Sequence, residues 1–207
     1  MLDELIQWGA AAAVHRGEDL SGDQYLVKPF ASKMLIAVVD GVGHGVEAAT
    51  ASQTAISALE ANAGQPIDTL FKACHQRLAG SRGVVMTVAL IDSALHSLTW
   101  AGVGNVEGRL LRADKESSHP EETLLLRSGV VGHNLPSTLN VSTLQVFKGD
   151  VLILATDGIR ADFATRLHIG RSAHQIANDI LARHNKGTDD ALVVVARYRG
   201  GGPSAAS

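Results

Sequence analysis

The chain has 207 residues, of which 45% are hydrophobic and 19% are charged, so we expect one folded domain with a sizeable core rather than a disordered chain. Its 18 basic and 21 acidic side chains leave a net charge of −3 with histidines neutral, and without a basic excess we expect no nucleic-acid partner. The single cysteine, Cys74, excludes an internal disulfide and a CxxC-type zinc or redox site.

Residue periodicity and turn residues predict strands and helices in an order that does not alternate regularly. The chain lacks the βαβα rhythm of a doubly wound sheet, so we predict an α+β fold of packed antiparallel sheets covered by helices. In chain order we expect strands at 5–15, 24–30 and 34–40, helices at 46–62 and 66–79, strands at 84–92, 94–101, 104–111, 122–127, 139–147 and 151–156, a helix at 172–184, and a strand at 191–198.

The three helices rest on different signals. Pro66 suits the first turn of the second helix and Gly80 closes it. Ser172 and Gln175 form a possible capping box at the start of the third. The helix at 46–62 rests on its alanine-rich composition.

The chain ends and the apolar runs predict the location and the domain limits. The start, MLDELIQW, lacks the basic and apolar regions of a secretory signal. No apolar run approaches the roughly 20 residues needed to span a bilayer. We therefore expect a cytoplasmic protein with no membrane contact, one domain over residues 1–200, and a flexible tail over 201–207.

Three continuous apolar segments are each bordered by acids. Continuous apolar character indicates strands that are buried on both faces. Carboxylates at the edges of such strands are partly desolvated and repel one another, so they need a positive partner. If the third strand is antiparallel to the other two, all these acids meet at one edge of the core. The segments are MLIAVV (34–39) before Asp40, VLILAT (151–156) before Asp157, and ALVVVA (191–196) after Asp189 and Asp190.

Further residues near these strands add to the candidate site. Asp23 precedes another predicted strand, and oxygen-only clusters of this kind suit Mg²⁺ or Mn²⁺. The turn DGVGHG lets the backbone approach a ligand and lets the Gly41 carbonyl face an ion. His44 is the histidine closest to the suspected site, whereas Cys74 lies on an apolar helix stripe and is expected in the core. Taken singly, each Asp-Gly pair is more simply a turn.

Six segments, found in the same order along nearly the whole chain, resemble the PPM (PP2C-like) protein phosphatases, and in particular their SpoIIE-type branch. The lead-in HRGEDLSGDQY and the lack of an appended sensor domain resemble the stand-alone phosphatases of the stressosome pathway. The segments are SGD at 21–23, VVDGVGHG at 38–45, MTVALID at 86–92, AGVGN at 101–105, GDVLILATDGI at 149–159 and TDDALVVVARY at 188–198.

The resemblance implies an αββα sandwich with two Mn²⁺ or Mg²⁺ ions at one end. It implies that Asp40 bridges both ions and that the Gly41 carbonyl and Asp23 hold one of them. Asp157 and Asp189 would hold the other ion.

Two positions differ from the eukaryotic members of the family. Those members carry an acidic pair where this chain has Gly22 and Asp23, and a histidine where this chain has Val42. The resemblance implies a catalytic group of Asp40, Asp157 and His44, where His44 comes two residues after Val42. Asp190 is the alternative to Asp189 as a metal ligand.

The resemblance implies a protein serine/threonine phosphatase that acts on phosphorylated STAS-domain proteins of a stressosome, similar to RsbS and RsbR, and so gives negative feedback on stress signalling. Two divalent ions would activate a water and neutralise charge on the phosphoryl group, so no nucleophilic side chain is needed.

Other interpretations stay open. The target could be a phosphorylated anti-anti-sigma factor, as for related SpoIIE-type enzymes, or the chain could be a scaffold of the same fold without activity. Dinucleotide binding is disfavoured, because the G-x-G-x-x-G fingerprint would need a third glycine after Gly41 and Gly43 at the position of Val46.

Overall fold

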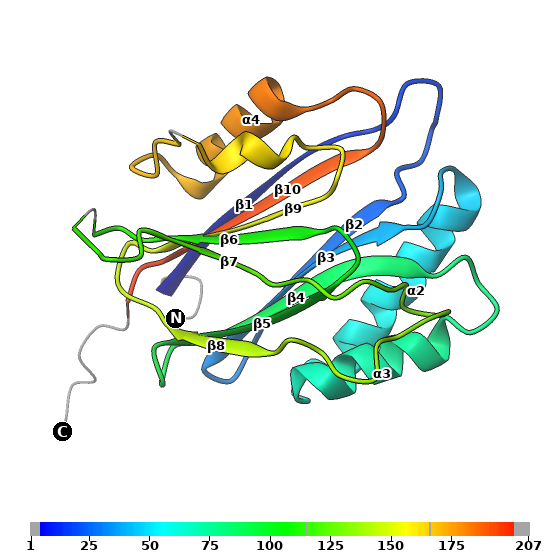
Figure 1. The fold of residues 1–207 in the computed structure, drawn as a ribbon, viewed down its shortest axis with the longest axis horizontal. Helices are drawn as coiled ribbons and strands as arrows, with labels where there is room; N and C mark the ends of the chain where they lie inside the picture. Colours follow the sequence, from blue (N-terminus) through cyan, green and yellow to red (C-terminus); the bar gives the residue numbers. More distant parts are fainter. Residues whose placement is uncertain (1–4, 115, 166, 201–207) are drawn as a thin grey trace.

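The computed structural model describes residues 5–114, 116–165 and 167–200, which form two stacked antiparallel sheets between two layers of helix (Figure 1). The predicted tail at 201–207 lies outside the described residues. The first sheet has the strand order β1 (Ile6–Ala13), β10 (Ala191–Tyr198), β9 (Val151–Ala155), β6 (Glu107–Leu111) and β7 (Glu121–Thr123). The second has the order β2 (Asp23–Phe30), β3 (Lys33–Gly41), β4 (Val84–Asp92), β5 (Ser97–Val103) and β8 (Ser142–Gln145).

Helices cover the outer face of each sheet (Figure 1). Helices α2 (Val46–Ala61) and α3 (Ile67–Arg77) pack on the second sheet. Helix α4 (Ala173–His184) packs on β1 and β10 of the first, next to the short 3₁₀ helix η1 (Ala161–Ala164). The predicted αββα sandwich is therefore confirmed.

Apolar side chains fill the three interfaces of this sandwich. Phe71 lies in the cluster between α2, α3 and the second sheet, Trp100 lies between the sheets, and Phe163 lies under α4. All three are at most 1% exposed. Every residue of β9 is buried, which agrees with the prediction of a strand covered on both faces.

The predicted strand starts at 94 and 104 were wrong by three residues each. Residues 94–96 belong to the turn between β4 and β5, in which Asp92 accepts the backbone N–H groups of Ala94 and Leu95, and His96 has a φ of 50°. Gly104 has a φ of 101°, which ends β5 and delays β6 to Glu107. Local side-chain caps and positive φ angles therefore set these boundaries rather than hydrophobic pattern.

None of the helices in the described part of the chain is long and apolar enough to cross a membrane.

Candidate active site

The second sheet brings two of the predicted acids together on neighbouring strands. Asp23 begins β2, and its register partner on β3 is Asp40. Directly opposite residues of an antiparallel pair place their side chains on the same face, close to one another. Asp23 is only 7% exposed, and Asp40 is half-buried.

The first sheet delivers the other predicted acids to the same end of the molecule. Strand β10 is antiparallel to β9, so Asp157, just after β9, and Asp189, just before β10, lie at the same edge. Thr156 links the two sheets there, because its hydroxyl donates to Oδ2 of Asp23 (2.7 Å) and accepts the N–H of Leu192 (2.9 Å). The condition stated from the sequence, that the third acid-bearing strand is antiparallel, therefore holds for β10 and β9. We call the five carboxylates that converge here the acid cluster: Asp23, Asp40, Asp157, Asp189 and Asp190.

Asp189 and Asp190 differ in their contacts. The carboxylate of Asp190 is buried and accepts the backbone N–H of His15 (2.8 Å) and that of Gly22 (2.7 Å), one on each oxygen. It thereby fixes the connection between β1 and β2. Asp189 is exposed, and its Oδ1 accepts the N–H of Asp190. The side chain of Asp189 is therefore the more available of the two for a ligand.

The acid cluster perturbs its own ionisation. Burial, followed by repulsion from Asp23 and the rest of the acid cluster, raises the pKa of Asp40 to about 8. Burial and the neighbouring acids likewise raise the pKa of Asp23 to about 7, against the lowering effect of the Thr156 hydrogen bond. Partial burial and Asp189 raise the pKa of Asp157. The carboxylates therefore repel one another in a partly desolvated place, and a cation would favour their charged forms.

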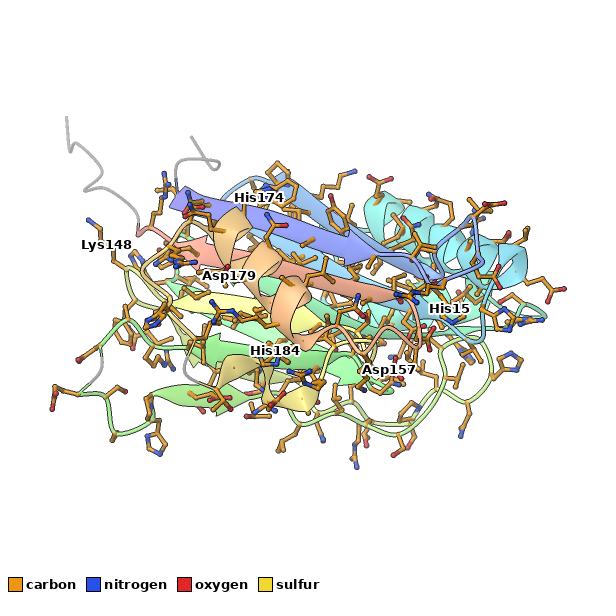
Figure 2. All side chains as sticks on the ribbon, turned by 90° about the horizontal axis from the view of Figure 1, so that it is seen from above. His15, Lys148, Asp157, His174, Asp179 and His184 are labelled. Carbon is orange, nitrogen blue, oxygen red and sulfur yellow. The ribbon has the colours of Figure 1, made fainter. Side chains whose placement is uncertain are left out.

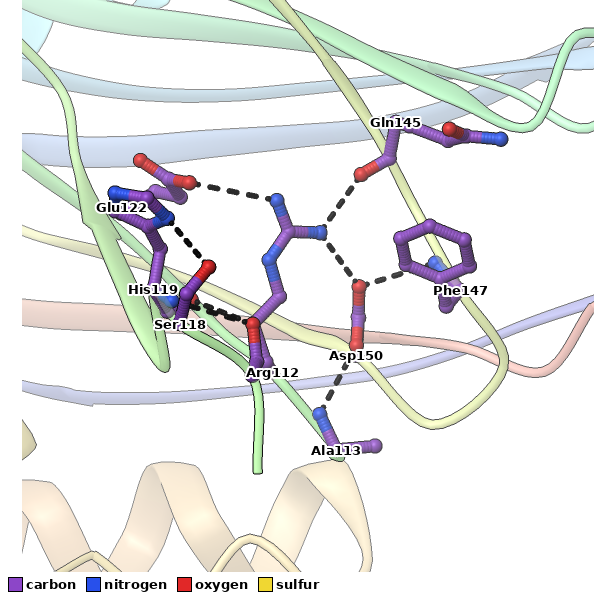
Figure 3. Close-up of polar contacts among 9 residues, drawn as sticks. Arg112, Ala113, Ser118, His119, Glu122, Gln145, Phe147 and Asp150 are labelled. Atoms are coloured by element: carbon purple, nitrogen blue, oxygen red, sulfur yellow. Dashed lines mark hydrogen bonds and ion pairs between the residues drawn. The ribbon is translucent and has the colours of Figure 1, made fainter. Parts of the chain in front are cut away.

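A buried acid at the opposite end of β9 provides a contrast. Asp150, only 2% exposed, precedes this strand as Asp157 follows it. Its carboxylate accepts a hydrogen bond from Arg112 (2.9 Å) and from the N–H groups of Ala113 and Phe147 (3.0 Å each), as Figure 3 shows. The fold thus supplies an arginine to the buried acid at one end of the strand and gathers further acids at the other.

Figure 2 shows both ends of β9: Lys148 lies near the end that Asp150 precedes, and Asp157 and His15 lie at the end with the acid cluster.

In both predicted Asp-Gly pairs, glycine is required because neighbouring backbone packs closely against it, not because it has a left-handed backbone conformation. A Cβ on Gly41 would lie 2.2 Å from the carbonyl oxygen of Ala48 in α2. A Cβ on Gly158 would lie 1.9 Å from the carbonyl oxygen of Asp190. Glycine therefore lets α2 and the β10 entry approach the strand ends that carry Asp40 and Asp157.

Four polar residues that hold the site together were not predicted from the sequence. Besides Thr156, Asn105 donates to Oδ2 of Asp157 (2.7 Å), and Lys186 lies next to Asp157 and lowers the pKa of its carboxyl group. Ser52 of α2 donates its hydroxyl to the carbonyl of Gly22. A signal existed for two of them, since Asn105 ends the AGVGN segment and Thr156 directly precedes Asp157.

His44, the predicted catalytic histidine, lies at the surface. Its side chain is 73% exposed, and its Nδ1 lies 2.8 Å from Oε1 of Glu18. Among the described residues no hydrogen bond or ion pair joins His44 to the acid cluster.

The acid cluster is an open group of oxygen donors. No three His, Cys, Asp or Glu side chains of residues 5–114, 116–165 and 167–200 already lie close enough to form a complete metal-ligand set. The chemistry of the donors nevertheless fits hard divalent ions, because all are carboxylates, and among the described residues the one cation that lowers the pKa of any of them is Lys186, next to Asp157.

Comparisons with known proteins agree with this geometry. Residues 31–199 match the family described as Stage II sporulation protein E (SpoIIE), a match that covers well over half of the chain. The chain belongs to the SpoIIE family. SpoIIE proteins are PP2C-like serine/threonine phosphatases, and the fold of this member is the PP2C-like sandwich.

One relative and two solved structures match most of the chain. Phosphoserine phosphatase RsbX of Bacillus subtilis (strain 168) is 26% identical over 182 residues, which are 87% of this chain and 89% of RsbX. A solved structure of RsbX in complex with magnesium is 25% identical, with a TM-score of 0.82 over 93% of this chain and 95% of that one.

A further structure, from work on the bacterial stressosome as a modular system adapted to control secondary messenger signaling, is 29% identical. Its TM-score is 0.84, over 93% of this chain and 99% of that one.

Proposed function

We propose that this SpoIIE-family phosphatase removes phosphate from phosphoserine or phosphothreonine of STAS-domain stressosome proteins, with two divalent ions held by the acid cluster. The observation that supports this most is the convergence of mutually repelling carboxylates, several of them partly or fully buried, from both sheets at one end of the molecule. Repulsion between such groups costs stability unless cations offset it.

In this proposal, the divalent ions would be held by Asp40, Asp23, the Gly41 carbonyl, Asp157 and Asp189. The exposed side chain of Asp189 supports its choice over Asp190, whose two oxygens are occupied by backbone N–H groups. Bound divalent ions would activate water and neutralise the charge of the phosphoryl oxygens.

The other residues of the site orient these ligands and move protons. Thr156 holds one oxygen of Asp23, and Asn105 holds one oxygen of Asp157, so each carboxylate is fixed in direction. His44 is the predicted proton donor to the serine or threonine alkoxide that leaves the phosphoryl group.

The choice of substrate rests on the relatives. RsbX is described as a phosphoserine phosphatase, its structure contains magnesium, and a further similar structure comes from work on the bacterial stressosome. We propose the same substrate class and either Mg²⁺ or Mn²⁺ for this chain. The cytoplasmic location and the single domain over 1–200 stay predictions.

The test is hydrolysis of p-nitrophenyl phosphate and of purified phospho-STAS proteins, with Mn²⁺ or Mg²⁺ and with EDTA. We expect Asp40→Asn to lower both rates by about a thousandfold or more, because several kcal/mol of transition-state stabilisation are lost. Asp68→Asn, at an exposed acid of α3, is the control and should keep the wild-type rates. Near-normal, EDTA-sensitive activity of Asp40→Asn would refute the site assignment.

The same assay separates the alternatives. Faster hydrolysis of a phosphorylated anti-anti-sigma factor than of stressosome STAS proteins would refute the proposed substrate and leave the proposed chemistry in place. Absence of any hydrolysis by a chain that binds Mn²⁺ in a calorimetric titration would instead favour a scaffold.

A further inference from the structure

A groove with a volume of about 870 Å³ begins at Val42 and Gly43, two and three residues beyond Asp40 of the acid cluster. One wall is the first half of α2, from Val46 to Thr54, and the other walls are the turn at 80–82 and the loop around Val130 and His133. Its lining is mainly apolar, and two of the valines that line it are exposed to solvent, Val46 at 67% and Val42 at 38%. Exposed apolar side chains that line one groove favour an apolar partner.

The groove is continuous with the strand end that carries Asp40. Val42 and Gly43 line it, and they directly follow Asp40 and Gly41. The chain rises at most about 3.5 Å per residue, so the groove begins within roughly 7 Å of Asp40, a distance spanned by about two residues of an extended peptide.

Hydrogen bonds fix the walls of the groove to this strand end. The N–H of Val42 donates to the carbonyl of Gly83 (3.1 Å), and Val84 and Val131 exchange two backbone hydrogen bonds of 2.9 and 2.8 Å. The groove is therefore a preformed surface, whose position relative to Asp40 is set by the β3 and β4 pairing.

Arg82 lies at the edge of the groove with half of its guanidinium group available. Its Nη2 is 2.5 Å from Oε2 of Glu47 in α2. Its Nη1 lies against the backbone of Gly43, 2.6 Å from the place of a Cβ there, and has no hydrogen-bond partner among the described residues. A guanidinium group held in this way presents N–H donors to carbonyl or carboxylate oxygens of a bound chain.

We propose that this groove binds the segment of the substrate protein that flanks the phosphorylated residue. An apolar side chain about two residues from the phosphoserine enters between Val42, Val46 and Val130, and Arg82 donates to oxygens of the same segment. This inference rests on the proposed function, since it needs a phosphoprotein whose phosphate is at the acid cluster. It makes α2 and the turn at 80–82 the part of the chain that selects the substrate.

The test uses phosphoserine peptides that carry one leucine at successive positions on either side of the phosphoserine. We expect the wild-type enzyme to prefer one leucine position, with kcat/KM about tenfold to a hundredfold higher, as for one buried apolar side chain. Thr50→Trp fills the groove and should abolish this preference. It should also lower the ratio of peptide kcat/KM to that of p-nitrophenyl phosphate by a similar factor.

Two further variants make the test specific. Glu60→Trp adds the same side chain to an exposed position of α2 that does not line the groove, and should keep the ratio at the wild-type value. Arg82→Ala should raise KM for the peptide more than for p-nitrophenyl phosphate, whereas an equal effect on both would place Arg82 at the phosphate and refute its role here.

The outcomes distinguish failure of this inference from failure of the proposed function. Hydrolysis of the peptides without a leucine preference, or an unchanged ratio in Thr50→Trp, would overturn the inference alone. A change of sedimentation rate in Thr50→Trp with an unchanged ratio would assign the groove to a contact between chains. No hydrolysis of any phosphoester by the wild-type enzyme would instead refute the proposed function.

Discussion

The consecutive residues Asp189 and Asp190 show how one position along the chain decides between structure and chemistry. Alternation along the entry to β10 turns Asp190 inward, to the backbone N–H groups of His15 and Gly22, and leaves Asp189 at the exposed edge of the acid cluster. The sequence alone offered no way to choose between two adjacent aspartates, because both precede the same apolar strand.

This difference predicts opposite effects of the same substitution. We expect Asp190→Asn to lower the free energy of unfolding by about 1–3 kcal/mol, since one backbone N–H loses a charged acceptor. Asp189→Asn should keep the stability measured in EDTA, because the amide oxygen still accepts the N–H of Asp190, and should lose most of the Mn²⁺-dependent activity. Denaturant unfolding and phosphatase assays on both variants check this. Full activity of Asp189→Asn with loss of activity in a folded Asp190→Asn would reverse the assignment.

The role of His44 depends on the leaving group. A serine alkoxide needs a proton as it leaves, whereas p-nitrophenolate does not. We therefore expect His44→Ala to slow hydrolysis of a phosphoserine peptide by at most about 10²-fold and to change p-nitrophenyl phosphate hydrolysis much less. His174→Ala, at an exposed histidine of α4, is the control. An unchanged rate on the peptide would remove His44 from the mechanism.

At the scale of elements, the start of α4 follows directly from local sequence. Ser172 accepts the N–H of Gln175, and the side chain of Gln175 accepts the N–H of Ser172, which completes the predicted capping box. Such local pairs need no knowledge of the tertiary fold, which explains why the predicted helix bounds agree with the structure to within one residue here.

Removal of this cap should weaken the element without touching the chemistry. We expect Ser172→Ala to lower the free energy of unfolding by about 1 kcal/mol, because the N–H of Gln175 at the start of the helix loses its acceptor. Ser57→Ala removes an exposed hydroxyl that donates to the carbonyl of Gln53 within α2, and should leave stability unchanged or slightly higher. Thermal or denaturant unfolding compares the two variants. An equal loss of stability in both variants would mean that the capping box stabilises the protein no more than an exposed serine hydroxyl does.

The strands illustrate the limit of such local reasoning. The buried strands β3, β9 and β10 were predicted nearly in full, because a short continuous apolar run between turn residues is typical of a strand covered on both faces. The loop from residue 124 to 141, which carries Val130 and His133 of the groove, was not predicted in full, because the strands expected at 122–127 and 139–147 extend into it. Its position depends on bonds to distant elements, such as that from the N–H of Gly132 to His75 of α3, which leave no trace in the local pattern.

For the whole molecule, the stacking of the two sheets creates the site. Asp23 and Asp157 lie far apart in sequence and on different sheets, and the hydroxyl of Thr156 connects these sheets by its bond to Asp23. Physical reasoning could predict that the acids at these strand ends converge only on the condition that the third strand is antiparallel to the other two. It could not predict Thr156, Asn105 or Lys186 as partners, since those contacts depend on how the sheets and loops are placed.

The acid cluster makes the stability of the metal-free protein depend on pH. The pKa values of Asp40 and Asp23 are about 8 and about 7 in the folded chain, against 3.8 for an ordinary aspartate. The folded chain thus holds protons that the unfolded chain releases above about pH 4, so its free energy of unfolding falls as pH rises toward about 8. Divalent ions bind the ionised carboxylates and should reverse the loss.

Asp→Asn substitutions at Asp40 and Asp150 test this directly. In EDTA at about pH 8, Asp40→Asn should raise the free energy of unfolding by an amount on the order of a few kcal/mol, and the gain should vanish near pH 4, where the carboxyl is protonated. Asp150→Asn should lower it instead, because Arg112 loses its buried charged partner. Chemical denaturation across this pH range, with and without Mn²⁺, measures both. A metal-free protein whose stability rises between about pH 5 and about pH 8, with Asp40→Asn less stable than wild type, would show that the five carboxylates are compensated by the fold itself.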